Sequence, residues 1–341
     1  MDMSLEQPSP LKRFFRTWRR EIIRGSVLFG LVVGIGLFLR TVTTNIKQHI
    51  PSTLAALSAF GDMDWGDDEG GNLFGHGREV GDEWNYSVKL RPNQRLWLRN
   101  TNGPIEVVGG KGDSVEVHAE KSWRNSDPKA VELRAVPSEG GVTICAMWDA
   151  KERRCEAGGD YHLNGLRKND VAVRFTVVLP HGVPVDASTI NGGLDINDVS
   201  APVEANTVNG RIGVNTSAGP VHATTVNGSI EANMQALTSG DVHLTTVNGS
   251  VMAGLPRKIN AELDAETVNG RVESDLPVKL VGKMSTRHLR GTIGSGGPML
   301  KLMTVNGSIT VHEAEIGAMH APHPPYPVVR PRVRVVLPDR P

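Results

Sequence analysis

Apolar residues return at fixed distances from a series of Asn-Gly pairs in the second half of the sequence. Counted from each Asn, they stand six and four residues before it, one residue before it and three residues after it. Successive Asn residues from Asn191 to Asn269 are 18, 18, 21 and 21 residues apart; a further 21 residues reach Arg290, and 16 more reach Asn306. A repeat of this kind predicts a solenoid in which each repeat forms one coil.

Alternation within each repeat predicts a β-strand on both sides of the Asn-Gly pair. The position five before the Asn is mostly polar and lies between two apolar positions, which is the period of two of a strand. The apolar positions then change phase between four before and one before the Asn, so we expect a bend or bulge there. On this interpretation an axial core is filled by Val208, Val226, Val247, Val268 and Val305.

The tetrapeptide Thr-Val-Asn-Gly, which begins at 207, 225, 246, 267 and 304, is expected to turn the corner of each coil. Asn and Gly both tolerate positive φ, and stacked Asn amides can hydrogen-bond from one coil to the next. The predicted structural corners are Asn102-Gly103, Asn191-Gly192, Asn209-Gly210, Asn227-Gly228, Asn248-Gly249, Asn269-Gly270 and Asn306-Gly307.

We predict an all-β fold, a parallel β-solenoid that resembles a single-stranded β-helix, with one N-terminal transmembrane helix. The coil is expected to be right-handed, as crossovers between parallel strands are. Asn-Gly between alternating runs is also a strong hairpin signal, so an antiparallel sandwich or barrel is the structural alternative. The recurrence of the same side-chain class at each position favours the solenoid, because like residues would then stack on like.

The N-terminal end predicts a membrane anchor. Six basic residues precede an uncharged apolar run from Gly25 to Leu39. Residues 22–40 are long enough to span a bilayer if Arg24 reaches the headgroups, and the basic flank 1–21 should stay in the cytoplasm. A cleaved signal peptide and a buried soluble helix are the alternatives. Gly30 and Gly34 have the spacing that lets two such anchors pack as a dimer.

Composition changes mark the remaining boundaries. Residues 41–83 are acidic and Gly-rich and predict a linker, and residues 314–341 predict a Pro-rich disordered tail. The folded β-solenoid is expected over 84–313, with an insertion at 122–170. Lys and Arg together number 37, as do Asp and Glu, so the charge indicates no nucleic-acid partner.

The insertion contains the two cysteines of the chain, Cys145 and Cys155. They are ten residues apart on the side of the anchor that we expect to be exported, and this predicts a disulfide. Two free thiols are the alternative, since a zinc site needs more ligands than two cysteines supply.

One outward-facing position carries candidate chemistry. The residues five before the Asn include Asp186, Glu204, His222, His243 and Asp264. Stacking would place His222 beside His243 with carboxylates on either side, a strip that could bind a metal or a sugar, although a solvated face has the same composition.

The sequence resembles the putative-adhesin, β-strand-repeat family of bacterial envelope proteins. The resemblance covers about 84–312 and depends on "NTNGPIEVVGG", "FTVVLPHGVPVDASTINGGLDI" and the repeated Thr-Val-Asn-Gly. It implies a β-solenoid with one N-terminal span, an adhesive or envelope role, and no assigned catalytic residues. "RHLRG" at 287–291 departs from the pattern because Arg290 replaces Asn.

These features favour a membrane-anchored, non-catalytic binding or structural module outside the membrane, whose ligand would be a glycan or a protein. We expect no catalytic, cofactor or metal site. An envelope-stress sensor or regulatory accessory protein is a second hypothesis, and a carbohydrate-active β-helix enzyme is a third.

Overall fold

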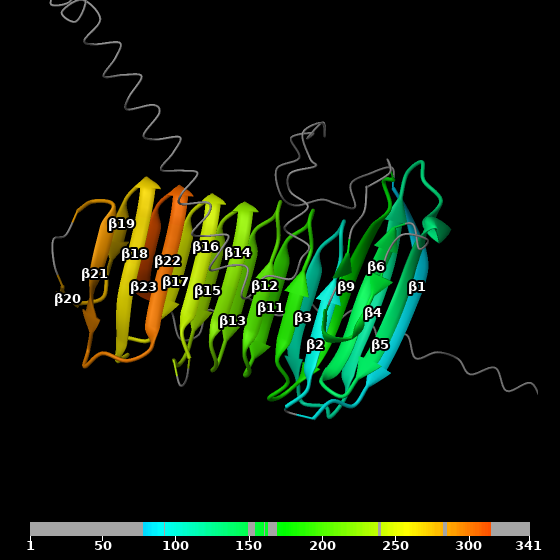
Figure 1. Ribbon diagram of the computed structural model, residues 1–341, viewed down its shortest axis with the longest axis horizontal. Helices are drawn as coiled ribbons and strands as arrows, with labels where there is room; N and C mark the ends of the chain where they lie inside the picture. The colour runs from blue at the N-terminus through cyan, green and yellow to red at the C-terminus, as the bar shows by residue number, and fades with distance from the viewer. Residues whose placement is uncertain are drawn as a thin grey trace, which may run out of the picture. The chain divides into compact units, whose positions relative to one another are not determined.

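The structure is a computed structural model that describes residues 78–91, 93–148, 154–159, 161–162, 169–237, 240–281 and 285–314. In this part of the chain nearly all regular structure is β-strand, in two large sheets (Figure 1). The predicted cytoplasmic segment 1–21 and membrane span 22–40 lie outside the described residues, as do most of the linker and tail. None of the helices within the described residues has the length and apolar character needed to cross a bilayer.

The first large sheet, sheet A, has ten strands. In spatial order they are β1 (Glu79–Val88), β4 (Val115–Trp123), β9 (Ala172–Pro180), β3 (Ile105–Gly110), β11 (Leu194–Val199), β13 (Ile212–Thr216), β15 (Ile230–Met234), β17 (Val251–Leu255), β23 (Ile309–Glu313) and β19 (Val272–Ser274).

The second large sheet, sheet B, has eleven strands. In spatial order they are β20 (Val278–Leu280), β21 (His288–Ile293), β18 (Ala261–Asn269), β22 (Met299–Asn306), β16 (Val242–Asn248), β14 (Val221–Asn227), β12 (Val203–Asn206), β10 (Val185–Ser188), β2 (Arg95–Arg99), β6 (Gly141–Trp148) and β5 (Val131–Ser138). The short strands β7 (Arg154–Cys155) and β8 (Tyr161–His162) form a separate pair, and the 3₁₀ turns are η2 (Pro128–Ala130) and η3 (Ala157–Gly159).

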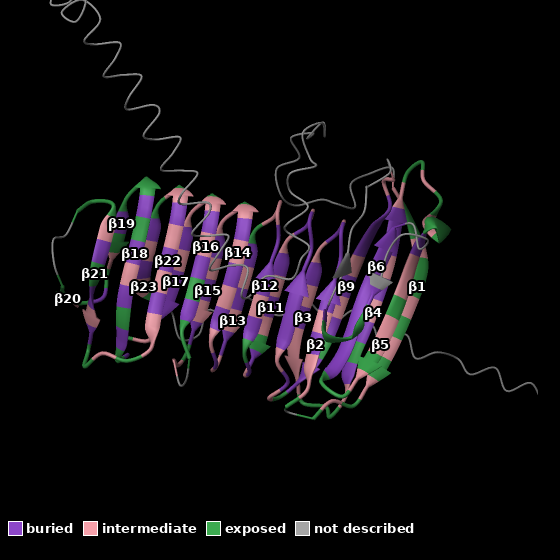
Figure 2. Ribbon diagram, viewed as in Figure 1, coloured by how far each residue is buried: buried purple, intermediate pink, exposed green. Residues whose placement is uncertain are grey.

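Each repeat contributes one strand to sheet B and the next to sheet A, so the chain winds as a solenoid with two strands per coil. Equivalent strands of neighbouring coils pair in parallel, for example β10 with β12 and β12 with β14. Buried residues alternate with less buried ones along these strands (Figure 2), and the inward faces of both sheets share one apolar core. The strands on either side of an Asn-Gly corner belong to different sheets, so these corners are not hairpins.

The order of the last coils differs from the order in the sequence. β22 pairs with β16 on one side and with β18 on the other, so the coil β22–β23 lies between β16–β17 and β18–β19. The expected coil at Arg290 does not exist, because β21 runs antiparallel to β18 and pairs with β20 on its other edge. This antiparallel pair covers the edge of sheet B, and the chain then returns to fill the position beside β16.

The expected phase change before the corner is also absent. Alternation continues through the tetrapeptide, so Thr225 and Thr246 are each 1% exposed in the core, whereas Val226 and Val247 are only partly buried and Val268 is exposed. The predicted axial column of Val residues was therefore wrong. The inward position belongs to Thr because the hydroxyl has a partner inside the corner, as described below.

Two boundaries lie in unexpected places at the N-terminal end of the sheets. β1 begins at Glu79, inside the predicted linker 41–83, and pairs antiparallel with β4 while Trp84 and Tyr86 pack against the core. Within the expected insertion 122–170, β6 pairs in parallel with β2, and β5 pairs antiparallel with β6. These two strands therefore continue sheet B.

Candidate functional site

The Thr of each corner ties one coil to the next. The Thr246 Oγ1 donates a hydrogen bond of 2.8 Å to the Gly228 carbonyl oxygen. The equivalent bonds join Thr189 to Gly103, Thr207 to Gly192, Thr225 to Gly210, Thr267 to Gly307 and Thr304 to Gly249. The Thr methyl group can therefore pack in the core while the hydroxyl satisfies a main-chain acceptor.

The Asn side chains form a ladder along the same corners, as the sequence indicated. The Asn209 Nδ2 donates to the Asn191 Oδ1 at 2.9 Å. Bonds of 2.8 Å continue the series from Asn227 to Asn209, Asn248 to Asn227, Asn306 to Asn248 and Asn269 to Asn306. Asn102 departs from the pattern, because its Nδ2 donates to the Val171 carbonyl oxygen.

The corner glycines are required mainly by the close approach of neighbouring coils. A Cβ added to Gly228 would lie 2.0 Å from the Gly210 carbonyl oxygen, and the other corner glycines meet backbone at similar distances. The positive φ that we expected occurs among these corner residues only at Gly103 (124°) and Gly307 (156°). The repeated tetrapeptide is thus used in contacts between coils.

A second Asn ladder lies on the outer face of sheet A, and the sequence analysis missed it. The Asn215 Nδ2 donates to the Asn197 Oδ1 at 2.6 Å, and the Asn233 Nδ2 donates to the Asn215 Oδ1 at 3.0 Å. The signal was present as an Asn six residues after the corner Asn in three successive repeats.

The outer face of sheet B carries the polar row that the sequence singled out. Its members, in strand order from β10, are Asp186, Glu204, His222, His243, Lys301 and Asp264. The His222 and His243 rings stack with their centroids 5.0 Å apart, as expected. The expected carboxylate beyond His243 is replaced by Lys301, because the coil β22–β23 separates Asp264 from the histidines. In the described part of the chain, no group of three or more His, Cys, Asp or Glu residues could hold a metal ion.

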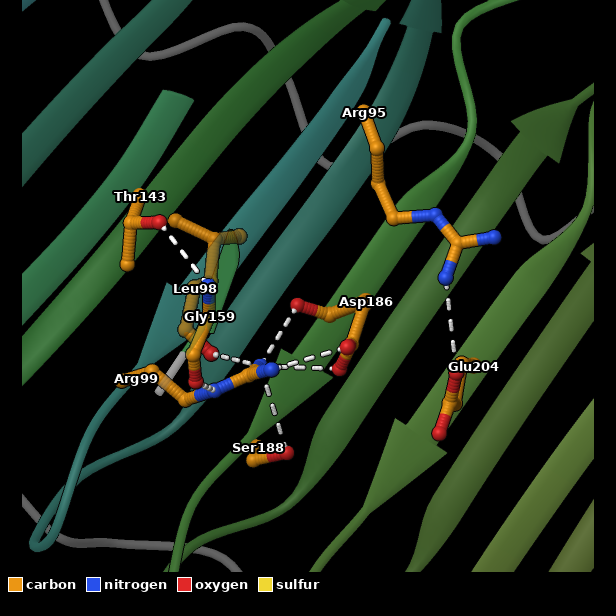
Figure 3. A network of polar contacts seen from close by, with 8 residues as sticks. All are labelled: Arg95, Leu98, Arg99, Thr143, Gly159, Asp186, Ser188 and Glu204. Atoms are coloured by element: carbon orange, nitrogen blue, oxygen red, sulfur yellow. Dashed lines mark hydrogen bonds and ion pairs between the residues drawn. The ribbon is translucent and has the colours of Figure 1, made fainter. Parts of the chain in front are cut away.

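A buried ion pair closes one end of this row (Figure 3). Arg99, which is 1% exposed, donates through Nη1 and Nη2 to the two carboxylate oxygens of Asp186, each at 2.8 Å. Arg99 also donates through Nε to the Gly159 carbonyl oxygen at 2.8 Å and through Nη1 to the Asp186 carbonyl oxygen at 3.0 Å. Removing only one partner of such a pair strongly destabilises the folded protein, because the other charge is left buried without a partner.

Glu204 lies in the next coil beside this pair. Burial first, and then the negative charge of Asp186, raise the pKa of Glu204 from 4.5 to about 7. Arg95 opposes this shift, with its Nη1 3.6 Å from the Glu204 Oε2. The Asn206 side chain also acts to lower this pKa, although its buried Nδ2 has no partner of normal hydrogen-bond geometry. The outer face of sheet B therefore holds a carboxyl group that can exchange a proton near neutral pH.

The two cysteines hold the chain that covers Arg99. Cys145 of β6 is joined to Cys155 of β7 in the structure, with their Cα atoms 6.0 Å apart. Two residues after Cys155 the turn η3 begins, and its Gly159 N donates to the Thr143 Oγ1 while its carbonyl oxygen accepts from Arg99. The covalent link thus keeps Gly159 over the buried ion pair.

The family described as Toastrack DUF4097 matches residues 94–312, which is more than half of the chain. The protein therefore belongs to this family, and this confirms the resemblance that its repeats indicated. No curated protein matches the sequence.

Several solved structures also match. A putative cell adhesion protein from Clostridium sporogenes is 9% identical with a TM-score of 0.39, over 68% of this chain and 100% of that one. A putative adhesin from Bacteroides fragilis is 10% identical with a TM-score of 0.28, over 68% of this chain and 97% of that one. Membership of the family rests on the match over residues 94–312 alone.

Proposed function

We propose that this protein is a non-catalytic β-solenoid that serves as a binding or structural module of the cell envelope. The observation that carries the proposal is that the repeated residues make contacts between coils. The Thr hydroxyls, the Asn amides and the Gly backbone of successive corners bind the neighbouring coil, so the repeat builds a scaffold. Scaffolds of stacked repeats present extended surfaces to ligands.

The outer face of sheet B is the surface that we assign to binding. The side chains there vary along one row, from Glu204 through His222 and His243 to Lys301, whereas the corners repeat. This row offers a titratable carboxyl group, imidazoles and an ammonium group, which suit hydroxyl-rich or charged ligands such as glycans and polar protein surfaces.

The proposed location is outside the membrane, with the N-terminal segment as a signal anchor. The basic flank 1–21 and the apolar run within 22–40 support this orientation. The linked cysteines also support it, because disulfides persist in oxidising compartments.

Binding can be tested with a soluble fragment of residues 78–314, which contains every described strand. We expect the fragment to bind at least one component of an array of glycans and envelope proteins, and the double variant His222→Ala/His243→Ala to bind it more weakly. Thr310→Ala, on the outer face of sheet A, is the matched control. A fragment that binds nothing on the array, or a double variant that binds as well as the control, would contradict the assigned surface.

The location has its own test. Protease added to intact spheroplasts should remove the 78–314 region of the full-length protein while cytoplasmic markers stay intact. Protection of that region under these conditions would show that the proposed orientation is wrong.

A further inference from the structure

We propose that Asn269 is a site of spontaneous deamidation, and that the stacking of the coils protects the other Asn-Gly corners of the ladder. This inference is independent of what the protein binds. It depends on how each corner is held by the next coil, and on which corner has no further coil beyond it.

The reaction at an Asn-Gly pair begins at the main-chain nitrogen of the Gly. This nitrogen loses its proton to solvent base and attacks the side-chain Cγ of the preceding Asn. The bond from Cγ to Nδ2 breaks, and Nδ2 leaves as ammonia after taking a proton from water. Hydrolysis of the resulting succinimide consumes one water molecule and leaves aspartate or isoaspartate. Gly favours the step because it has no Cβ to hinder the approach.

Inside the ladder the attacking nitrogen is held by a neighbouring coil. The Gly228 N–H donates to the Asn248 carbonyl oxygen at 2.9 Å, and the Gly249 N–H donates to the Asn306 carbonyl oxygen at 2.9 Å. The same bond runs from Gly103 to Asn191, from Gly192 to Asn209, from Gly210 to Asn227 and from Gly307 to Asn269. Each such N–H must give up its hydrogen bond before it can react.

The side chains of the interior corners are restrained as well. The Asn227 Oδ1 accepts from Asn248, while the Asn227 Nδ2 donates to Asn209. Both ends of the amide are therefore fixed, and rotation of Cγ toward the Gly nitrogen would break two hydrogen bonds.

The series ends at Asn269 in β18. In the described part of the chain no parallel coil follows β18–β19, and the next segment accepts main-chain hydrogen bonds only on either side of the corner, at Arg287 from Thr267 and at Thr286 from Val272. Among the described residues, the Gly270 N–H between them has no hydrogen-bond acceptor. The Asn269 Nδ2 donates to the Asn306 Oδ1, but no Asn of a further coil donates to the Asn269 Oδ1. Gly270 is also the one exposed Gly among the ladder corners that the structure describes, and Asn269 itself is exposed. The nucleophile, the target carbon and the water needed for hydrolysis are thus all available at this corner.

The stacking also predicts an order for later events. Deamidation of Asn269 removes the Nδ2 group that donates to the Asn306 Oδ1. An isoaspartate link also distorts the main chain at 269, whose carbonyl oxygen accepts from the Gly307 N–H. Asn306 then becomes the end of the ladder and is expected to react next, before Asn248.

Peptide mapping of the full-length protein tests the inference. The folded protein and the same protein in denaturant are incubated in parallel at mildly alkaline pH and then digested with trypsin. Cleavage after Lys258 and Arg271 places Asn269 in a peptide without any other Asn-Gly pair. Fragment spectra distinguish Asn269 from Asn260, which precedes Ala.

In the folded protein we expect Asn269 to deamidate at least about tenfold faster than Asn227 or Asn248, which react only through local opening. In denaturant the pairs should react at similar rates, because each Asn is then followed by an unrestrained Gly. Asn269→Gln, which retains the amide but closes the ring far more slowly, should abolish the early product. Equal rates at Asn269 and the interior corners of the folded protein would overturn the inference. Failure of Asn269 to react while the denatured chain does would overturn it equally.

Discussion

At the scale of the single residue, the corner tetrapeptide assigns a different task to each of its positions. Thr faces the core and binds a carbonyl oxygen of the neighbouring coil, Val lies partly exposed, Asn extends the ladder, and Gly lets two backbones approach. The inward side chain of the corner is therefore polar, which is why its apolar neighbour was mistaken for the core residue.

Thr246 tests the hydroxyl contact. Thr246→Val keeps the shape of the side chain but leaves the Gly228 carbonyl oxygen without its donor. We expect a loss of about 1–3 kcal/mol in the free energy of unfolding, measured with urea. Thr245→Val, on the outward side of the same strand, should change stability by less than about 0.5 kcal/mol. Equal effects of the two substitutions would mean that the hydroxyl does not stabilise the corner.

Gly228 tests the close approach of the coils. A Cβ at this position would lie 2.0 Å from the Gly210 carbonyl oxygen, so Gly228→Ala must push two coils apart. We expect a loss of about 3 kcal/mol or more in unfolding free energy. Gly112→Ala is the matched control, since its Cβ would meet nothing closer than 4.0 Å. A Gly228→Ala protein as stable as the control would contradict the packing described here.

At the scale of the element, the neighbouring strands β2, β10 and β12 bring charged residues together, and the loop that the two cysteines hold contacts Arg99 among them. Arg99 lies 87 residues from Asp186 in sequence, and Glu204 lies one coil beyond Asp186, but the three strands are consecutive in sheet B. Their proximity produces both the buried ion pair and the raised pKa of Glu204.

Glu204 should make stability depend on pH. Its pKa is raised from 4.5 to about 7 in the folded state, so between these values the folded protein binds more protons than the unfolded chain. The tighter binding of a proton by Glu204 in the folded state therefore adds to the free energy of unfolding at pH 4.5. This stabilisation is lost as the pH rises through about 7. Relative to wild type, Glu204→Gln should become progressively more stable over this interval, as measured by urea unfolding at a series of pH values. Glu231→Gln, on the outer face of sheet A, is the control, and a constant difference between wild type and Glu204→Gln would refute the assignment.

The disulfide should stabilise the loop over Arg99. The double variant Cys145→Ser/Cys155→Ser is expected to lose about 2–3 kcal/mol, the entropy of closing a loop of about ten residues. Reducing agent should shift the unfolding midpoint of the wild type toward that of the variant and leave the variant unchanged. Mass spectrometry of an unreduced digest should show the linked peptides in protein from its native compartment, and two free thiols there would contradict the pairing.

At the scale of the whole molecule, the solenoid is built out of sequence order at its C-terminal end. The coil β22–β23 lies between β16–β17 and β18–β19, and β20 and β21 cover the edge beyond. The antiparallel cover ends the stack of parallel strands in sheet B, where an open edge would invite pairing with another chain.

Cysteine cross-linking can verify this order. Ser250 and Ser308 occupy equivalent positions of adjacent coils, where the Val251 N–H donates to the Ser308 carbonyl oxygen, whereas Arg271 lies one coil further. In the pair Ser250→Cys/Ser308→Cys the backbones are about 5 Å apart, and a short thiol reagent should join them. The pair Ser250→Cys/Arg271→Cys spans two strand spacings and should stay unlinked. The opposite result would mean that the coils stack in sequence order.

Local patterns in the sequence already determined much of this protein. Period-two alternation indicated the strands, the recurrence near 20 residues indicated the coils, and Asn at equivalent positions indicated the ladder, because stacked repeats must place like side chains together. The pairing of Cys145 with Cys155 was expected from their number and spacing, and the structure joins them.

Only the tertiary structure decided which coil follows which, and which groups meet across coils. Leu263 and Leu300 fit the same inward position equally well, so no local pattern could tell that β22 would precede β18 in the stack. The inward Thr, the neighbour of His243 and the pKa of Glu204 follow from contacts between coils, which the pattern within one repeat does not specify. Alternation reports which face of a strand is buried, but partners across a sheet are chosen by the packing of the whole core.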